Sequence, residues 1–314
     1  MNKESRILIV GHDDIIENSL YGYFEKHGFT NVFSSSKIAP DVHNQSAIAH
    51  FFENEQPEYV FLGSTRSGGI AANQKFPGEF IYSNLESQNN IIHAAYKSGV
   101  KKLLFFAGSC IYPKECPQPI KEEYLLTAPL EPTSEAYSVA KIAGIKLCQA
   151  YKKQYGFNAA VVIPATVYGP GSDADIETSH VIGALIGRFA AAVTSGEKEV
   201  KVWGSGKPRR EFIFASDFVD ACLFLMEKYN ENEMINVGWG TDVSVKELAE
   251  MIKEISGFKG KILFDPGKPD GTMQKLMDNT KLNRLGWKPK VSLSQGIKKT
   301  YDWYVQHKLA GLKK

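Results

Sequence analysis

The chain has 314 residues, of which 43% are hydrophobic and 23% charged, and its formal net charge is +2. This composition is typical of a globular protein with a well-developed core, and it excludes disordered and collagen-like chains. The near balance of 37 basic and 35 acidic residues gives no electrostatic footprint for nucleic acid or for a polybasic membrane surface.

The N-terminal apolar run Ile7–Val10 is too short for a secretory signal, and no apolar stretch reaches the length of a membrane span. Four cysteines stand at no metal-like spacing, which predicts a reducing compartment, no disulfide framework and no metal site. They are Cys110, Cys116, Cys148 and Cys222. We therefore expect a cytoplasmic protein that binds neither nucleic acid nor a membrane.

Strands and helices alternate along the first half of the chain. Nearly continuous apolar runs predict buried strands, and longer stretches ending at glycine predict helices. The strands are expected at 6–10, 32–34, 59–62, 102–107 and 159–164, and the helices at 15–27, 46–54, 78–98 and 137–155. Repeated strand–helix units of this kind predict an α/β fold with a Rossmann-like, doubly wound parallel sheet.

The second half is more mixed. Helices are expected at 181–194, 217–229, 245–256 (with Ser244 as N-cap) and 293–308, and short strands at 200–203 and 235–237. We expect a smaller C-terminal substrate-binding domain that is interleaved with the sheet. Residues 1–165 and 196–235 would form the Rossmann-like domain, and residues 166–195 and 236–314 the substrate-binding domain.

Tyr137 and Lys141 open a predicted helix with the spacing YxxxK. Residues four apart lie on the same face of a helix, and an ammonium group lowers the pKa of a neighbouring phenol. Tyr137 could then act as an acid or base toward a sugar hydroxyl or carbonyl, and Lys141 could hold a cofactor ribose. The same spacing also occurs on solvated helix faces. Here it follows the buried strand at 102–107, in the order that such enzymes use, and this favours the functional interpretation.

Several segments resemble GDP-fucose synthases in similar order and spacing. They are EPTSEAYSVAKIAGIKLC, GSCIYPK, VWGSGKPRREF, INVG and KPDGTMQKLMD, and the likeness runs from about Arg6 to His307. This family belongs to the extended short-chain dehydrogenases, within the NAD-dependent epimerase/dehydratase superfamily. Its members epimerise C3 and C5 of GDP-4-keto-6-deoxymannose and then reduce C4 with NADPH. The resemblance implies this activity, a GDP-sugar substrate, and a homodimer formed through the helices at 78–98 and 137–155.

The resemblance also implies catalytic roles. Tyr137 and Lys141 match the family's Tyr–Lys pair, and Cys110 and His180 match the base and acid of the epimerisation. Removing a proton beside a ketone on one face and returning it on the other inverts that carbon, and a thiolate and an imidazole can have pKa values near neutrality. Taken alone, Cys110 could be a buried small hydrophobe and His180 a structural histidine.

Positions similar to the family's nucleotide-sugar contacts are Arg188, Trp203, Arg210 and Asp270. The planar forks of the two arginines suit a diphosphate, and Lys275 could add positive charge. Surface arginines are also often simply solvated. The interleaved C-terminal domain would, by this resemblance, bind the nucleotide sugar.

The first strand–helix turn, beginning Gly11-His12-Asp13-Asp14, departs from the family. The family has glycines at the places of Gly11, Asp14 and Glu17, which let the backbone approach a pyrophosphate and let helix and strand pack closely. Only Gly11 remains. The carboxylates of Asp13 and Asp14 would cap the helix themselves, and one carboxylate about 5 Å from a phosphate charge costs roughly 3 kcal/mol at an effective dielectric near 20.

Other departures lie around the same site. Ser34–Ser36 stands where the family places an arginine for the 2′-phosphate of NADPH, and Gly63–Arg66 replaces a small apolar run that borders the cofactor. Gly108 replaces the catalytic serine; the adjacent Ser109 is a candidate hydroxyl, although in an extended segment its side chain would point to the other side. Ala165–Thr166 replaces a Thr–Asn pair.

The cofactor contacts implied by the resemblance are Gly11, His12, Gly108, Lys141 and Pro164. NADP(H) is the family's cofactor and NAD(H) is the alternative, while Asp13, Asp14 and Glu17 argue against binding either. Three functions stay open: an epimerase/reductase like GDP-fucose synthase, a cofactor-independent GDP-sugar epimerase that uses Cys110 and His180, and a non-catalytic nucleotide-sugar-binding homologue.

Overall fold

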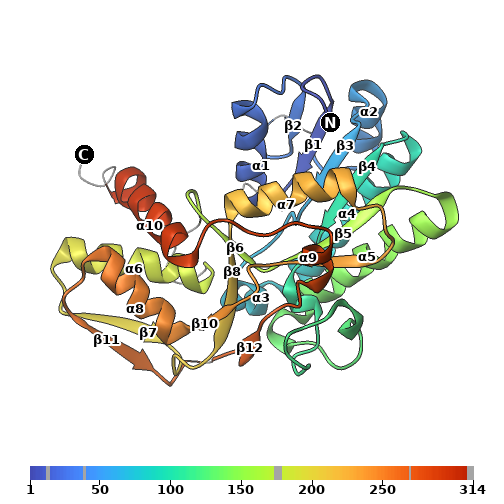
Figure 1. The fold of residues 1–314 in the computed structure, drawn as a ribbon. Coiled ribbons are helices and arrows are strands. Elements are labelled where there is room, and N and C mark those ends of the chain that lie inside the picture. Colours follow the sequence, from blue (N-terminus) through green and yellow to red (C-terminus); the bar gives the residue numbers. More distant parts are fainter. Residues whose placement is uncertain (12–14, 38–39, 173–178, 269, 310–314) are drawn as a thin grey trace.

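The computed structural model describes residues 1–11, 15–37, 40–172, 179–268 and 270–309. Six parallel strands form its central sheet in the order β2-β1-β3-β4-β5-β9 (Figure 1). Their bounds are β1 (Ile7–Val10), β2 (Val32–Ser34), β3 (Tyr59–Leu62), β4 (Lys102–Phe106), β5 (Ala159–Pro164) and β9 (Met234–Val237). Every residue of β1, β4 and β5 is buried. The predicted α/β fold with a doubly wound parallel sheet is confirmed.

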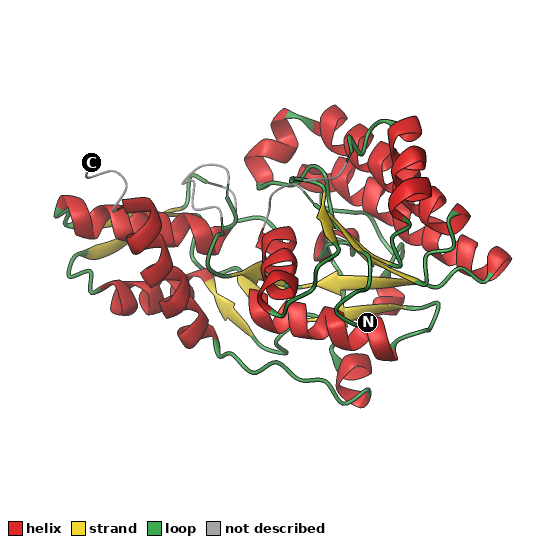
Figure 2. Ribbon diagram, turned by 90° about the horizontal axis from the view of Figure 1, so that it is seen from above, coloured by secondary structure: helices red, strands yellow, loops and turns green. Residues whose placement is uncertain are grey.

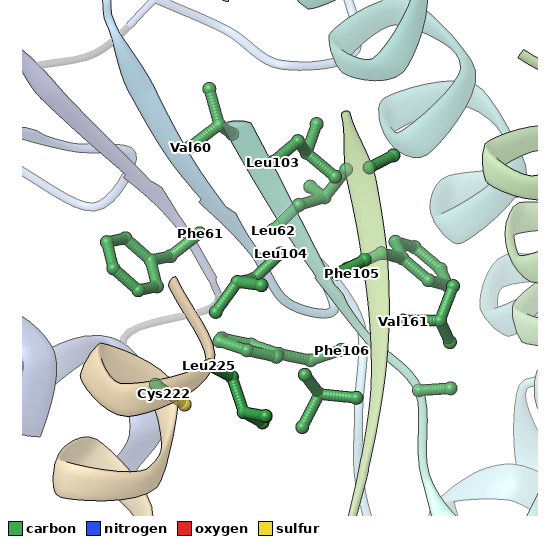
Figure 3. Packing of buried hydrophobic residues seen from close by; sticks show 14 of the residues in the cluster. Val60, Phe61, Leu62, Leu103, Leu104, Phe105, Phe106, Val161, Cys222 and Leu225 are labelled. Atoms are coloured by element: carbon green, nitrogen blue, oxygen red, sulfur yellow. The ribbon is translucent and has the colours of Figure 1, made fainter. Parts of the chain in front are cut away.

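Helices cover both faces of this sheet (Figures 1 and 2). α1 (Ile15–Lys26) and α7 (Ala215–Lys228) pack together on one face, and α2 (Gln45–Glu55), α4 (Pro77–Lys97) and α5 (Glu135–Tyr155) on the other. Successive side chains of β4 point to opposite faces of the sheet and all are buried, so both faces must be covered. The Phe106 ring lies 5.4 Å from that of Phe218 in α7, whereas Phe105 faces α5 (Figure 3). A β-carbon at Gly144 of α5 would lie only 2.4 Å from the Phe105 ring, so this close helix–sheet contact requires glycine.

A second group of elements lies beside the sheet. It contains α6 (Val181–Ser195), α8 (Val245–Ser256), α10 (Leu293–Tyr304) and the paired strands β7 (Glu199–Trp203) and β11 (Lys261–Asp265). A separate hydrophobic cluster, which includes Phe189, Leu248, Ile252 and Ile297, holds these elements together. The division of the chain into two domains by residue number stays a prediction.

A small mixed sheet joins the two groups. It consists of β6 (Thr166–Tyr168), β8 (Arg209–Phe214), β10 (Asp242–Ser244) and β12 (Gln274–Lys275). At its centre the buried Glu211 accepts hydrogen bonds from the backbone N–H groups of Gly240 (2.6 Å) and Met277 (3.0 Å) and from the Asn279 side chain (3.2 Å). One carboxylate therefore ties β8 to the segments that follow β9 and β12.

Most of the predicted elements are present. Ser244 is the N-cap of α8, as predicted, and forms a capping box with Glu247. The last helix ends at Tyr304 and continues as the π-helical turn η4 (Val305–Leu309), so it is shorter as an α-helix than predicted. The sequence did not predict the short helices α3 (Ile70–Lys75), α9 (Thr280–Arg284), η1 (Ser109–Ile111), η2 (Glu122–Tyr124) and η3 (Pro132–Ser134), nor β6, β8 and β10–β12.

Within the described residues, no helix is both long and apolar enough to cross a bilayer. No group of three or more His, Cys, Asp or Glu side chains in that part of the chain is arranged to hold a metal ion. The four cysteines are free thiols, two of them fully buried in the cluster around the central sheet.

Candidate active site

The carboxyl ends of β1, β3 and β4 meet at one edge of the central sheet, which is where doubly wound proteins bind their ligands. Gly11 follows β1 and Gly63 follows β3. The Gly63 N–H donates to the Val10 carbonyl oxygen over 2.7 Å, and a β-carbon at Gly63 would lie 2.9 Å from that oxygen. The two strand ends can approach this closely only with glycine at position 63.

Tyr137 lies in the first turn of α5 and points to this edge. Its phenol oxygen is 2.7 Å from Ser64 Oγ. Gly108 is extended (φ −130°, ψ 156°), and a β-carbon there would lie 3.8 Å from the Tyr137 oxygen and 3.5 Å from Cys110 Sγ. The Ser138 hydroxyl, also on α5, donates to the Cys110 carbonyl over 3.0 Å. The phenol of Tyr137 and the thiol of Cys110 therefore border the same small space beside Gly108.

The extended conformation expected at Ser109 is wrong. Ser109 begins the helical turn η1, because the Ile111 and Tyr112 N–H groups donate back to the carbonyls of Gly108 and Ser109. Among the described residues, its side chain makes no hydrogen bond with Tyr137. The hydroxyl that does reach Tyr137 belongs to Ser64, a residue that the sequence marked only as part of an altered segment.

Lys141 lies one helical turn after Tyr137. Its side chain is fully buried, and Nζ donates to the Gly63 carbonyl over 3.0 Å and stands 4.7 Å from the centre of the Phe105 ring. The Tyr–Lys pair therefore lies on one helix face, as its spacing predicted, and both side chains reach the end of β3. Tyr137 contacts Ser64, and Lys141 contacts Gly63.

Glu17, in the first turn of α1, points past Gly11 to the end of β2. Its Oε1 accepts hydrogen bonds from the hydroxyls of Ser34 (2.6 Å), Ser35 (3.1 Å) and Ser36 (2.9 Å) and from the Ser36 backbone N–H (3.0 Å). Glu17 is 1% exposed. We call these four residues the Glu17–serine cluster. Gly11 is part of its wall, since a β-carbon there would lie 2.7 Å from Glu17 Cβ, and its N–H donates to Ser35 Oγ.

This cluster allows a test of the expected cofactor. In dinucleotide-binding sheets the end of the second strand receives the adenosine ribose, and an arginine nearby accepts the 2′-phosphate of NADP. Here the hydroxyls at that position are bonded to a buried carboxylate, and Lys37, the next cation along the chain, lies over the Tyr21 ring at 3.7 Å. A carboxylate about 5 Å from a phosphate charge repels it by roughly 3 kcal/mol. A 2′-phosphate at this position would therefore meet hydroxyls that are already bonded to Glu17.

The pyrophosphate part of the expected site includes the turn after β1. His12, Asp13 and Asp14 lie outside the described residues. Pro164, another expected cofactor contact, is buried at the end of β5, where it pairs with Val237 of β9.

Two of the expected nucleotide-sugar residues are in contact. The Arg188 guanidinium of α6 lies 4.9 Å from the centre of the Trp203 ring, and its Nη1 donates to the Lys201 carbonyl over 2.7 Å. Trp203 ends β7 and is 41% exposed. The ammonium of Lys268 lies 5.0 Å from the same ring. An exposed indole with two neighbouring cations is suited to hold an anionic ligand with a planar base.

Asp270 and Arg210 form a second contact. The Asp270 carboxylate accepts hydrogen bonds from the Ser205 N–H (2.7 Å) and hydroxyl (2.8 Å), while Arg210 Nη2 lies 3.5 Å from the Asp270 carbonyl. A β-carbon at Gly271 would be 3.5 Å from that guanidinium nitrogen and 3.6 Å from Ile70 of α3. The unpredicted helix α3 thus belongs to the wall of this site.

Lys275 links the two parts of the site. It pairs with Arg210 in the register of β12 and β8. Burial lowers the pKa of Lys275; the Cys110 side chain opposes this shift, and the Arg210 charge adds to it. Burial also lowers the pKa of Arg210, which the Asp270 carboxylate partly reverses. Two of the cations expected at the diphosphate, Arg210 and Lys275, are therefore neighbours in adjacent strands, whereas Arg188 lies against Trp203.

His180 lies on a different element from Tyr137 and Cys110. It is the exposed N-cap of α6, with an extended backbone (φ −65°, ψ 155°). Within the described part of the chain, no hydrogen bond joins it to Cys110. Tyr137, Cys110 and Lys141 lie around the ends of β3 and β4, Lys275 acts electrostatically on Cys110, and His180 lies on another element, at the start of α6.

Known proteins are similar to this chain over nearly its whole length. Residues 7–238 match the NAD dependent epimerase/dehydratase family. GDP-L-fucose synthase 1 of Arabidopsis thaliana is 48% identical over 306 residues, covering 98% of this chain and 95% of that protein. A GDP-6-OMe-4-keto-L-xylo-heptose reductase from C. jejuni has a TM-score of 0.92 at 37% identity, covering 98% of this chain and 99% of that one. A GDP-mannoheptose C4 reductase from Campylobacter jejuni with NADP bound has a TM-score of 0.87 at 38% identity, covering 97% and 99%.

Proposed function

Because the chain belongs to the NAD-dependent epimerase/dehydratase family, we propose that it is an enzyme that modifies a GDP-linked 4-keto sugar at the carbons beside the ketone. GDP-sugar reductases and GDP-L-fucose synthases are similar to it over nearly its full length. The observation that carries the proposal is the space around Gly108, which the Tyr137 phenol and the Cys110 thiol both border.

These two groups suit proton transfer next to a ketone. A Cys110 thiolate takes the proton from C3 or C5, so that the C–H bond breaks, an S–H bond forms and the electron pair moves onto the C4 oxygen as an enolate. The Tyr137 O–H donates a hydrogen bond to that oxygen. His180, as the imidazolium, returns a proton to the opposite face of the carbon, and the ketone re-forms. The carbon is inverted and nothing is oxidised or reduced.

The rest of the site binds the nucleotide. Arg210 and Lys275 provide neighbouring cations for the diphosphate, and the Asp270 carboxylate fixes the turn after β7 beside them. Trp203, with the Arg188 guanidinium against it, provides a flat surface for the guanine. A GDP-sugar held this way directs its sugar toward Cys110, whose side chain is close enough to Lys275 to oppose the lowering of its pKa by burial.

Solvent exchange tests the proposal. In deuterium oxide, the protein should introduce deuterium at C3 or C5 of GDP-4-keto-6-deoxymannose without any added dinucleotide, as seen by NMR or mass spectrometry. Cys110→Ala should lose the exchange. Cys116→Ala, which removes the other partly buried cysteine, should keep it. Exchange at the rate of a protein-free control would refute the proposal.

A second candidate function is reduction of the C4 ketone with a nicotinamide dinucleotide. The Tyr137–Lys141 pair on one face of α5 favours it, as does the similarity to a reductase with NADP bound. The Glu17–serine cluster opposes it, because the adenosine end does not fit the 2′-phosphate. Loss of NADPH or NADH absorbance with a 4-keto GDP-sugar would establish this function.

We also propose a cytoplasmic homodimer. Four free thiols are consistent with a reducing compartment. The expected dimer helices α4 and α5 expose Tyr82 (66%), Tyr155 (47%) and Val139 (41%), and the stacked rings of Tyr96 and Tyr155 join the two helices. Light scattering of the purified protein should give twice the mass of the chain, and the mass of a single chain would contradict the dimer.

A further inference from the structure

We infer that the chain's own side chains fill the crevice in which its family binds a dinucleotide, so that this enzyme moves protons and transfers no hydride. The inference rests on the proposed function and narrows it to a redox-neutral reaction. It depends on two sets of internal contacts, one at the end of β2 and the other between the end of β3 and helix α5.

The first set is the Glu17–serine cluster. Four donors from Ser34, Ser35 and Ser36 converge on a single oxygen of Glu17, and the carboxylate is 1% exposed. A 2′-phosphate at the end of β2 would need these same hydroxyl and N–H groups as donors. It could obtain them only by leaving a buried carboxylate without its hydrogen bonds, which is strongly unfavourable.

The second set occupies the groups expected at the nicotinamide end. Lys141 is fully buried and donates to the Gly63 carbonyl, so its ammonium presents no surface to a ribose hydroxyl. The Ser64 hydroxyl, 2.7 Å from the Tyr137 oxygen, takes a position on the phenol that a ligand hydroxyl would otherwise use. Ser64 is itself 8% exposed, which fits an internal contact.

The two sets are continuous along the edge of the sheet. Between them, the Gly11 N–H donates to Ser35 Oγ, and the Gly63 N–H donates to the Val10 carbonyl. Polar groups at the ends of β1, β2 and β3 are thus bonded to one another. The space bordered by Gly108 and Cys110 belongs to the segment after β4 and the turn η1, and in the proposed function it carries the proton-transfer chemistry.

A direct titration tests the inference. The purified full chain is titrated by calorimetry with NADPH, with NADH and, as a check of the folded site, with GDP. We expect binding of GDP and no saturable binding of either dinucleotide up to about 1 mM. Saturable binding of NADPH or NADH with a Kd below about 1 mM would overturn the inference. Deuterium exchange without dinucleotide is measured separately, so failure of the proposed function is distinguished from failure of the inference.

A pair of double variants tests which residues close the crevice. Glu17→Gly with Ser64→Ala removes both internal occupants, whereas Glu17→Gln with Ser64→Thr keeps an acceptor and a hydroxyl at these positions. The first variant should bind NADPH or NADH at least tenfold more tightly than the second. If the first variant is folded, by circular dichroism and GDP binding, and gains nothing, these two residues do not close the crevice. If it does not fold, the titration of the unaltered chain decides.

Discussion

The Ser34 hydroxyl lies 2.6 Å from the Glu17 carboxylate, and both residues are buried. A hydrogen bond this short to an ionised acceptor is among the stronger ones in proteins, and Glu17 accepts three more. We predict that Glu17→Ala lowers the free energy of unfolding by about 3 kcal/mol, because it leaves buried donors without an acceptor. Urea unfolding measures this. Glu25→Ala, on the exposed side of the same helix, should change it by less than about 0.5 kcal/mol.

The Tyr137 phenol should contribute to the chemical step and little to binding. We expect Tyr137→Phe to slow deuterium exchange into the sugar by roughly 100-fold, since an O–H donor at a developing enolate is worth about that factor. The affinity for GDP should stay the same, because the phenol belongs to the sugar end of the site. Tyr155→Phe, on the same helix, is the matched control. Equal exchange rates in the two variants would remove Tyr137 from the mechanism.

Two adjacent arginines should differ in their effect on GDP binding. Arg209 makes ion pairs with Asp242 and Glu247, whereas Arg210 lies beside Asp270 and Lys275. Arg210→Lys should weaken GDP binding about tenfold, because an ammonium cannot bind two phosphate oxygens as a guanidinium does. Arg209→Lys should leave the affinity unchanged. Calorimetry compares the two, and equal losses would mean that Arg210 acts through the fold of β8.

Lys102 should make stability depend on pH in the alkaline range. Its Nζ donates to the Leu225 and Met226 carbonyls at the end of α7, and burial lowers its pKa from 10.5 to about 8. Between these two values the unfolded chain holds a proton that the folded chain has released, so the Lys102 contribution to stability rises from pH 8 to 10.5 and is lost as pH falls through 8. The free energy of unfolding of the unaltered chain, relative to that of Lys102→Met, should increase by about 2–3 kcal/mol between pH 7 and pH 10.

The control for this prediction is Lys153→Met, which removes an exposed lysine. Denaturant unfolding of all three proteins at pH 7, 8.5 and 10 gives the comparison. A difference between the native chain and Lys102→Met that stays constant with pH would show that Lys102 keeps an ordinary pKa in the folded state.

Restoring the missing serine should be structurally harmless and chemically insufficient. Gly108 has an extended backbone, and its nearest neighbours would meet a β-carbon at ordinary distances of 3.5–3.8 Å. Gly108→Ser should therefore change the free energy of unfolding by less than about 1 kcal/mol. It should not make the protein oxidise NADPH with a 4-keto GDP-sugar, because the crevice stays filled. Measurable oxidation by this single variant would show that only the serine was missing.

The sequence was sufficient to predict the central sheet. Apolar runs such as Ile7–Val10 and Ala159–Pro164 are buried on both faces, and such runs signal parallel strands directly. The short strands β10 and β12 were missed because two or three residues carry no measurable periodicity. Helix α3 was missed because its six residues, Ile70–Lys75, are too few to show a helical period. Its formation depends on contacts with neighbouring elements.

The site was predicted less completely. Motif spacing placed Tyr137 and Lys141 on one helix face, but their partners Ser64 and Gly63 come from the segment after β3, far away in the chain. Glu17 illustrates the same limit. An acidic residue in the first turn of a helix is normally solvated, and nothing in its neighbourhood indicates that its side chain turns inward to serines on the next strand.

The Glu17–serine cluster also constrains how this protein can change over evolutionary time. If Glu17 is replaced first, the Ser36 N–H and three hydroxyls lose their acceptor; if the serines are replaced first, a buried carboxylate is left without donors. Each single step back toward an open nucleotide pocket therefore passes through a less stable protein. The cluster therefore makes this loss hard to reverse by single substitutions. Descendants of this chain should change their sugar specificity more readily than they regain dinucleotide binding.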